Sequence, residues 1–285
     1  MKDKAMNVLS TEKKTLILSL LSEGNSLRTI SRVSGVARNT INKLLLEAGQ
    51  KALEIMDSEM INLRVNYLQI DEIWTFVGKK QKNLTPEERK GIELGDQYVF
   101  VAMDAETKLI PAFRVGKRNG ENTFSFLNEI RTRIVNTFQL TTDSFAPYKE
   151  TVDQVFGNDI HYGQIHKEYQ QDDKGEKRYS PANIIRVTVN SLIGRPDPDC
   201  ISTSFIERQN LTMRMQMRRF TRLTNGFSKS LKHLEAALAL HFFHYNFMRL
   251  HETIRVTPAM QAGISKHLMT WTEFLGWERE KHLAA

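Results

Sequence analysis

The chain has 285 residues, which is enough for two or three modest domains, and a formal net charge of +7. It contains neither an apolar run long enough to cross a bilayer nor the basic-then-apolar N-terminal pattern of a signal peptide, so we expect a cytoplasmic protein with no membrane partner. Its single cysteine, Cys200, excludes an internal disulfide framework and a cysteine zinc ribbon.

In chain order, residues 10–50 are predicted to form short helices arranged as a helix-turn-helix. Ser10 and Ser26 can cap the first two helices, and Gly35 can provide the turn before the third. A plain helical bundle is the alternative, because Ala37 lacks the side-chain oxygen of a good cap. The third helix would present polar side chains suited to phosphates and base edges, and we therefore expect these residues to bind DNA: Arg38, Asn39, Thr40, Asn42 and Lys43.

A connecting helix is expected at about Met56–Arg64, and then the pattern changes to strands and helices. Strands are predicted at 68–77, 97–103, 109–115, 138–142 and 160–165, and helices at 121–135 and 147–156. Successive strands followed by alternating helices and strands predict an α/β fold, an RNase H-like mixed sheet with helices on its faces. A polar stretch at about 170–202 is expected to be an insertion, in which Lys174, Lys177, Arg178 and Tyr179 could contact DNA or lie in a solvated loop.

The C-terminal part is predicted to be helical, at 206–219 and 228–249. Nine Lys or Arg and only three Glu lie between Glu207 and Arg255, so most of the positive charge is concentrated there. A basic segment alone is often a solvated helix face, but beside a candidate active site it favours nucleic acid as the partner. The predicted domains are a helix-turn-helix DNA-binding domain at 1–55, a linker helix at 56–65, a catalytic domain at 66–225 and a helical C-terminal region at 226–285.

Three carboxylates occupy positions that suit a metal site. Asp71 lies in an apolar strand, where an unpaired charge would be costly. Asp143 follows the strand 138–142 directly, at the end of the strand where ligand sites form in open α/β sheets. Glu207 begins a basic helix and has Arg214 two turns further on. Carboxylates that converge from separate elements can hold two magnesium ions, roughly 3.5–4 Å apart, for phosphodiester cleavage.

Each of these carboxylates also has a structural interpretation. Asp71 could be a salt-bridged core residue, and Glu72 could be the ligand instead, because consecutive strand residues point to opposite faces and only one fits easily. Asp143 could cap the following helix, and Glu207 could merely favour the N-terminus of its own helix. His241 and His244 have a metal-like spacing but lack an evident carboxylate or cysteine partner, so a structural or DNA-facing role is favoured for them.

Several segments together resemble one family. The similarity extends over about residues 66–263, and the segments that carry it are 69–80, 140–148, 204–211, 245–251 and 257–260. The first three contain Gln-Ile-Asp-Glu-Ile-Trp, Leu-Thr-Thr-Asp-Ser-Phe-Ala-Pro-Tyr and Ser-Phe-Ile-Glu-Arg-Gln-Asn-Leu. In these motifs and in their order, the chain resembles the insertion-sequence-one family of bacterial transposases.

The resemblance implies an RNase H-like core whose catalytic DDE triad and metal ligands are Asp71, Asp143 and Glu207. It implies two Mg²⁺ ions, for which Mn²⁺ can substitute, and a helix-turn-helix that binds terminal inverted repeats. Cleaved 3′ hydroxyls would then join target DNA, in a homodimer or higher oligomer on double-stranded DNA at the bacterial nucleoid. Basic residues on and after the glutamate helix would contact DNA, namely Arg208, Arg214, Arg218 and Arg219.

Two other functions stay open beside the DNA transposase. A catalytically silent, transposase-derived DNA-binding regulator would be free to lose the three carboxylates, whereas all three are present. A stand-alone RNase H-type nuclease would not need the N-terminal helix-turn-helix. The sequence therefore favours the active transposase.

Overall fold

A computed structural model of the chain describes residues 8–169, 184–221 and 224–278. The described residues divide into two compact units. The first contains those of Met1–Ile61, Trp74–Tyr98 and Asn210–Ala285, and the second contains Asn62–Ile73 and Val99–Gln209. Single strands and helices run across the points where the units separate, so this division does not test the predicted boundaries at 55, 65 and 225.

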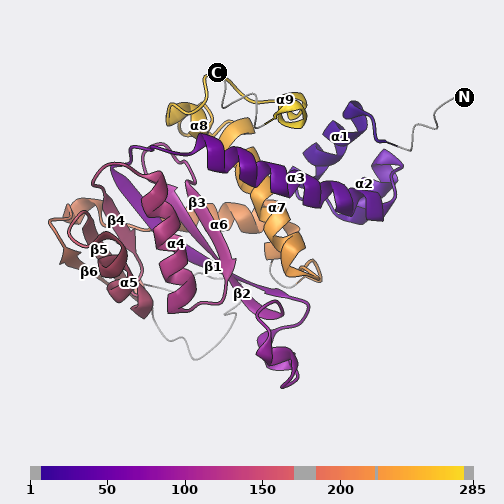
Figure 1. Cartoon of the computed structure of the whole chain (residues 1–285). Helices are drawn as coiled ribbons and strands as arrows, with labels where there is room; N and C mark the ends of the chain where they lie inside the picture. Colours follow the sequence, from indigo (N-terminus) through magenta and orange to yellow (C-terminus); the bar gives the residue numbers. More distant parts are fainter. Residues whose placement is uncertain (1–7, 170–183, 222–223, 279–285) are drawn as a thin grey trace, which may run out of the picture. The chain divides into compact units, whose positions relative to one another are not determined.

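One mixed sheet of six strands organises the fold, in the order β3-β2-β1-β4-β5-β6 (Figure 1). Strands β1, β4 and β5 are parallel neighbours, and β6 is antiparallel to β5. The predicted mixed α/β class is therefore confirmed. The strands are β1 (Tyr67–Val77), β2 (Gly95–Asp104), β3 (Ala112–Gly116), β4 (Gln139–Thr142), β5 (His161–Tyr169) and β6 (Ile184–Ile193).

The central strands are buried, and the last strand is not. All four residues of β4 are buried, as expected for a parallel strand covered on both faces. By contrast, β6 is largely exposed along its length. Residues Ile184–Ile193 of the expected insertion at 170–202 form strand β6, whose β-branched residues pair with β5. The proposed DNA contacts Lys174, Lys177, Arg178 and Tyr179 lie outside the described residues.

The helices of the second unit cover this sheet. Helix α4 (Gly120–Arg133) is capped by Asn119, whose side chain accepts from the Asn122 N–H at 3.0 Å. Helix α5 (Ala146–Phe156) has a proline in its first turn, as predicted. The two helices pack against each other, and Phe126 and Tyr148 are buried beneath them.

The N-terminal helices are α1 (Thr11–Ser22), α2 (Leu27–Ser34) and α3 (Arg38–Glu59). The predicted caps are confirmed: Ser10 Oγ accepts from the Lys13 N–H at 3.3 Å, and Ser26 Oγ accepts from the Thr29 N–H at 3.1 Å. Gly35 ends α2 in the left-handed region at φ 71°, which a side chain would strain.

Helix α3 is longer than predicted. It continues past residue 50 to Glu59, so the expected linker helix at 56–65 is its last turn, and the following residues are not helical. Gly49 lies inside this helix against Ala236, where an added Cβ would come within 2.5 Å of the Ala236 Cα.

The C-terminal part is helical, as predicted, with different bounds. Helix α7 (Leu231–Phe243) buries Leu234, Leu238 and Phe242, and a π-helical turn, His244–Met248, follows it directly. The other helices are α6 (Ser204–Gln216), α8 (Pro258–Gln261), α9 (Trp271–Gly276) and the 3₁₀ turns Gln81–Asn83, Glu88–Lys90, Pro198–Cys200 and Arg218–Phe220. Among the described helices, none combines the length and apolar character that a bilayer span requires.

Candidate active site

Strand register brings Asp71 and Asp143 to the same level of the sheet. In the parallel pair of β1 and β4, Tyr67 lies opposite Gln139 and Gln69 lies opposite Thr141. Two residues further along, the same register leads to Asp71 on β1 and to Asp143 directly after β4. Neighbouring strands lie about 4.8 Å apart, so their carboxylates meet at the carboxyl end of this pair.

The acidic cluster has a third member, Glu72. One carboxylate oxygen from each of Asp71, Glu72 and Asp143 lies within 4.8 Å of the others. The expectation that only one of Asp71 and Glu72 fits is therefore wrong. The Glu72 N–H donates to Asp71 Oδ1 at 2.9 Å, so the Asp71 carboxylate bends back along the strand, and the alternation of buried and exposed residues is interrupted at this pair.

Glu72 is the most enclosed of these carboxylates, with a side chain only 2% exposed. Arg118 Nε donates to Glu72 Oε2 at 2.9 Å, and the hydroxyl of the buried Tyr148 donates to Glu72 Oε1. Burial, together with the charges of Asp143 and Asp71, raises the pKa of Glu72 to about 7, although Tyr148 and Arg118 oppose the rise. Glu72 thus changes its charge near neutral pH, and Arg118 is the cation that pairs with its ionised form.

Asp143 has both of its carboxylate oxygens engaged. Oδ1 accepts from the Phe145 N–H at 2.9 Å, and Oδ2 accepts from Arg118 Nη2 at 3.3 Å. The first contact is a local turn and not a cap of α5, because the N-cap residue is Phe145 and this helix has no side-chain cap hydrogen bond. The side chain is nevertheless 40% exposed toward the cleft, which leaves room for a further ligand.

Glu207 lines the same cleft but does not join the acidic cluster among the described residues. It lies in the first turn of α6, where Oε1 accepts from Thr203 Oγ1 at 2.6 Å and from Lys167 Nζ. Lys167, near the end of β5, also donates to Thr203 at 3.3 Å. Lys167 therefore holds the carboxylate of Glu207 in an ion pair at the rim of the cleft.

The cleft has a volume of about 510 Å³, and its walls combine the three predicted carboxylates with Arg118 and Lys167. Clustered carboxylate oxygens are the donors that magnesium prefers, so Asp71, Asp143 and Glu72 fit one divalent ion. Glu207 places a further carboxylate in the wall of the same cleft.

The residues predicted to contact DNA lie on three elements. On α3, Arg38, Asn39, Thr40 and Lys43 are exposed and Asn42 is half-buried, and Lys43 pairs with Glu47 at 3.7 Å. On α6, Arg208 is exposed and Arg214 is half-buried. In the turn after α6, Arg218 is exposed, whereas Arg219 is half-buried and donates to Ser228 Oγ at 2.9 Å.

Sequence reasoning missed the two cations of the cleft. Arg118 lies in the basic loop between β3 and α4, and Lys167 lies near the end of β5, between His166 and Glu168. Each is distant in sequence from the carboxylate that it contacts. The only sequence signal for Arg118 and Lys167 was that each is a basic residue near the end of a predicted strand.

Two buried residues with titratable side chains, Asp104 and His241, lie away from the cleft. Asp104 accepts from the Glu106 N–H at 3.0 Å in the turn after β2. His241 is buried, and burial lowers its pKa to about 3, with His244 and Arg249 adding to the effect. His241 is therefore neutral at physiological pH.

No protein-family model and no curated protein matches the chain. By structure, it is similar to piggyBac transposase in a synaptic complex with hairpin DNA, at 9% identity and a TM-score of 0.44, over 96% of this chain and 73% of that one. It is also similar to Mos1 transposase in a pre-cleavage transpososome (9% identity, TM-score 0.21, 56% of this chain and 61% of that one). The Mos1 strand transfer complex gives 11% identity and a TM-score of 0.23, over 57% of this chain and 60% of that one. The chain spans less than two thirds of the Mos1 chains.

Proposed function

We propose that the chain is a DNA transposase that cleaves the ends of its element and joins the 3′ hydroxyl to target DNA. The observation that carries the proposal is the cleft in which Asp71, Asp143 and Glu207, three carboxylates from separate elements, face the same space. The sheet order supports an RNase H-like core, because the two central strands β1 and β4 supply the aspartates at their carboxyl ends.

In this proposal, Asp71, Asp143 and Glu207 hold magnesium, with Glu72 buried behind them. Magnesium bound there would activate a water or a 3′ hydroxyl and stabilise the leaving oxygen. Arg118 keeps Glu72 and Asp143 in place through its two contacts. Lys167 holds Glu207 at the rim of the cleft, beside the exposed Arg208, which suits the binding of a DNA phosphate.

The N-terminal helices supply the DNA-binding half of the proposal. Helices α2 and α3 meet at the turn of Gly35, and α3 presents exposed Arg38, Asn39 and Lys43 near its start. Such a helix can enter the major groove and contact bases and phosphates. We propose that it binds terminal inverted repeats, with two element ends held by a dimer or a larger assembly.

A second function, DNA-binding regulation without catalysis, is favoured by one observation. Arg118 and Lys167 already form ion pairs with Asp143 and Glu207, so cations of the chain itself occupy two carboxylates of the cleft. In a catalytic site, these cations must give way to, or share their carboxylates with, the metal. The two functions differ in a single outcome, which is metal-dependent cutting.

The test is nicking of a labelled duplex that carries the two ends of the element, with magnesium or with EDTA. Wild type should release 3′ ends only with magnesium, and Asp143→Asn should lose this activity by at least 100-fold while it still binds the duplex. Asp159→Asn is the matched control, since Asp159 is exposed, does not line the cleft and has its ion pair with Arg131 at 3.8 Å. Specific binding by wild type without metal-dependent cutting would favour the regulator.

A further inference from the structure

A second concave site lies in the first unit. This pocket has a volume of about 900 Å³ and is lined by residues of α2, the start of α3, the turn after α6 and α7. Its cations are Arg28, Arg38, Arg218, Arg219 and Lys229, and two histidines, His233 and His241, also line it. Among the described lining residues there is no aspartate or glutamate.

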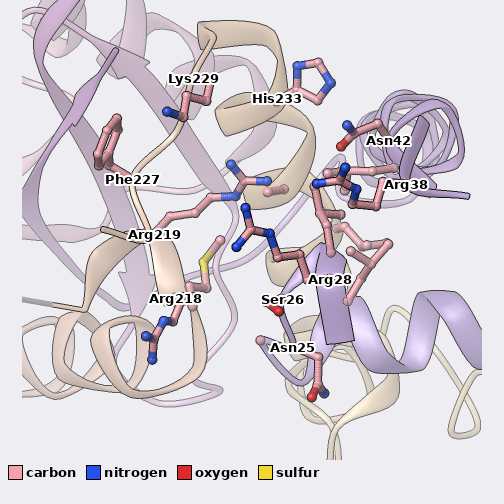
Figure 2. Close-up of a pocket in the computed structure, with 18 of the residues that line it drawn as sticks. Asn25, Ser26, Arg28, Arg38, Asn42, Arg218, Arg219, Phe227, Lys229 and His233 are labelled. Atoms are coloured by element: carbon pink, nitrogen blue, oxygen red, sulfur yellow. The ribbon is translucent and has the colours of Figure 1, made fainter. Parts of the chain in front are cut away.

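The cations of this pocket face one another without a compensating carboxylate. Figure 2 shows the side chains of Arg28, Arg38 and Arg219 extending into the pocket from different elements. Within the described part of the chain, neither Arg28, Arg38, Arg219 nor Lys229 has a carboxylate in ion-pair distance. Like charges that converge in this way repel, and an anion between them removes the repulsion.

Arg219 is another of these cations with no carboxylate of the described residues in ion-pair distance, and it is more buried than the others. Its Nη1 donates to Ser228 Oγ at 2.9 Å, and burial lowers the pKa of its guanidinium. Burial, with Arg219 and Lys232 as neighbouring charges, likewise lowers the pKa of His233. Both lowered pKa values show that positive charge is disfavoured in this pocket, and a bound anion would stabilise the charged forms.

Neutral donors complete the anion-binding character. The N-terminal turn of α3 lines the pocket, and Ala37 provides no side-chain cap, so main-chain N–H groups there are open to an anion. His241, a lining residue only 4% exposed, has no hydrogen-bond partner for Nε2 among the described residues. Asn25, Asn39 and Asn42 add amide donors at the same wall.

We infer that this pocket is a binding site for the phosphate backbone of double-stranded DNA, with Arg28, Arg38, Arg219 and Lys229 as its phosphate contacts. The inference rests on the proposed function and deepens it, because Arg28 and Lys229 join the predicted contacts Arg38 and Arg219 in one pocket. Five cations exceed the charge of any single phosphate, whereas a DNA strand offers one phosphate about every 3.4 Å. Arg38 then positions the duplex instead of reading bases.

The test uses Arg28→Gln and Lys229→Gln, two exposed side chains whose loss should leave the fold intact. Arg32→Gln and Lys232→Gln are the matched controls, because each removes a cation three or four residues away that does not line the pocket. Binding is measured in EDTA, against salt concentration, on a labelled duplex with the element ends and on a scrambled duplex of equal length. Inorganic pyrophosphate serves as a small-anion probe in calorimetry.

Each pocket variant should weaken binding about fivefold at 150 mM salt and lower the salt slope by about 0.9, equally on both duplexes. The controls should match wild type. Unchanged slopes for both variants, with wild type still binding the duplex, would overturn the pocket and leave the proposed function standing. A loss restricted to the end-bearing duplex would instead assign these residues to base reading and overturn the backbone contact.

The remaining outcomes are also decisive. Arg28-dependent pyrophosphate binding, with duplex binding unaffected by either variant, would make the pocket a small-anion site and contradict the inference. Failure of wild type to bind either duplex would remove the proposed function itself, and the inference with it.

Discussion

Arg118 contacts two carboxylates of the acidic cluster, so at the residue scale it does part of what a bound cation does. Its guanidinium donates to Glu72 at 2.9 Å and to Asp143 at 3.3 Å, and it stacks over the Phe145 ring at 3.9 Å from the ring centroid. Without this charge, Glu72 and the two aspartates would repel one another at close range. The cluster should therefore depend on Arg118 most when no metal is bound.

We expect Arg118→Gln to lower the Tm by about 2–4 °C in EDTA, because hydrogen bonds to buried charge are lost and carboxylate repulsion grows. Saturating magnesium should then raise the Tm of the variant more than that of wild type, since the metal replaces the missing charge. Thermal unfolding with EDTA and with magnesium measures both effects. Arg131→Gln is the control, because its partner Asp159 lies outside the cleft. An equal response to magnesium in wild type and Arg118→Gln would contradict this role.

His241 should make stability depend on pH in a defined window. Burial lowers its pKa to about 3, whereas the ordinary value is 6.5, so the folded protein excludes a proton that the unfolded chain binds. The stability is fully present above pH 6.5 and is lost as the pH falls from 6.5 toward 3. Between pH 7.5 and 5.5, wild type should lose about 1 kcal/mol more of unfolding free energy than His241→Leu. Urea unfolding at the two pH values measures the difference. Equal losses of unfolding free energy in wild type and His241→Leu would mean that His241 takes up a proton in the folded protein at pH 5.5.

At the scale of elements, the contact between α3 and α7 requires a glycine. A Cβ at Gly49 would lie 2.5 Å from Ala236 Cα and 2.7 Å from its carbonyl oxygen, so two helix backbones approach closely there. The expected cost of overpacking exceeds the gain in helix propensity that alanine brings.

We expect Gly49→Ala to lower the free energy of unfolding by about 1–2 kcal/mol, measured by urea titration. The control is Gly120→Ala, at the first position of α4, where an added Cβ meets nothing within 4 Å. That control should be neutral or slightly stabilising. A neutral Gly49→Ala would show that the helices can move apart at no cost.

Elements whose determinants are local were predictable. The caps Ser10 and Ser26, the turn at Gly35 and the apolar stripe of α7 each depend on residues within a few positions of one another. Strand ends could also be located, which is why Asp143 was expected at the carboxyl end of its strand.

Features that depend on pairing between distant segments were missed. The partners of the carboxylates, Arg118 for Asp143 and Lys167 for Glu207, are 25 and 40 residues away along the chain. Strand β6 was not predicted, because its structure depends on pairing with β5 and because polar residues flank it in the sequence. The opposite-face rule failed at Glu72 because the Asp71 side chain bends to the main chain of its neighbour.

At the scale of the whole molecule, the acidic cleft and the basic pocket belong to different units. Asp71, Asp143 and Glu207 all lie in the second unit, and the pocket around Arg28 and Arg219 lies entirely in the first. Metal-dependent cutting and metal-independent DNA binding should therefore respond to separate sets of substitutions. Carboxylate variants should bind DNA in EDTA at least as tightly as wild type, because they remove negative charge.

The most direct test of the central claim concerns Glu207, since it lies outside the acidic cluster and pairs with Lys167. The measurement is magnesium-dependent joining of a pre-cleaved end duplex, with its free 3′ hydroxyl, to a supercoiled plasmid by wild type and by Glu207→Gln. Wild type should give joined products, and Glu207→Gln should give at least 100-fold fewer while it binds the end duplex normally. Joining at the wild-type rate by Glu207→Gln would contradict the three-carboxylate site.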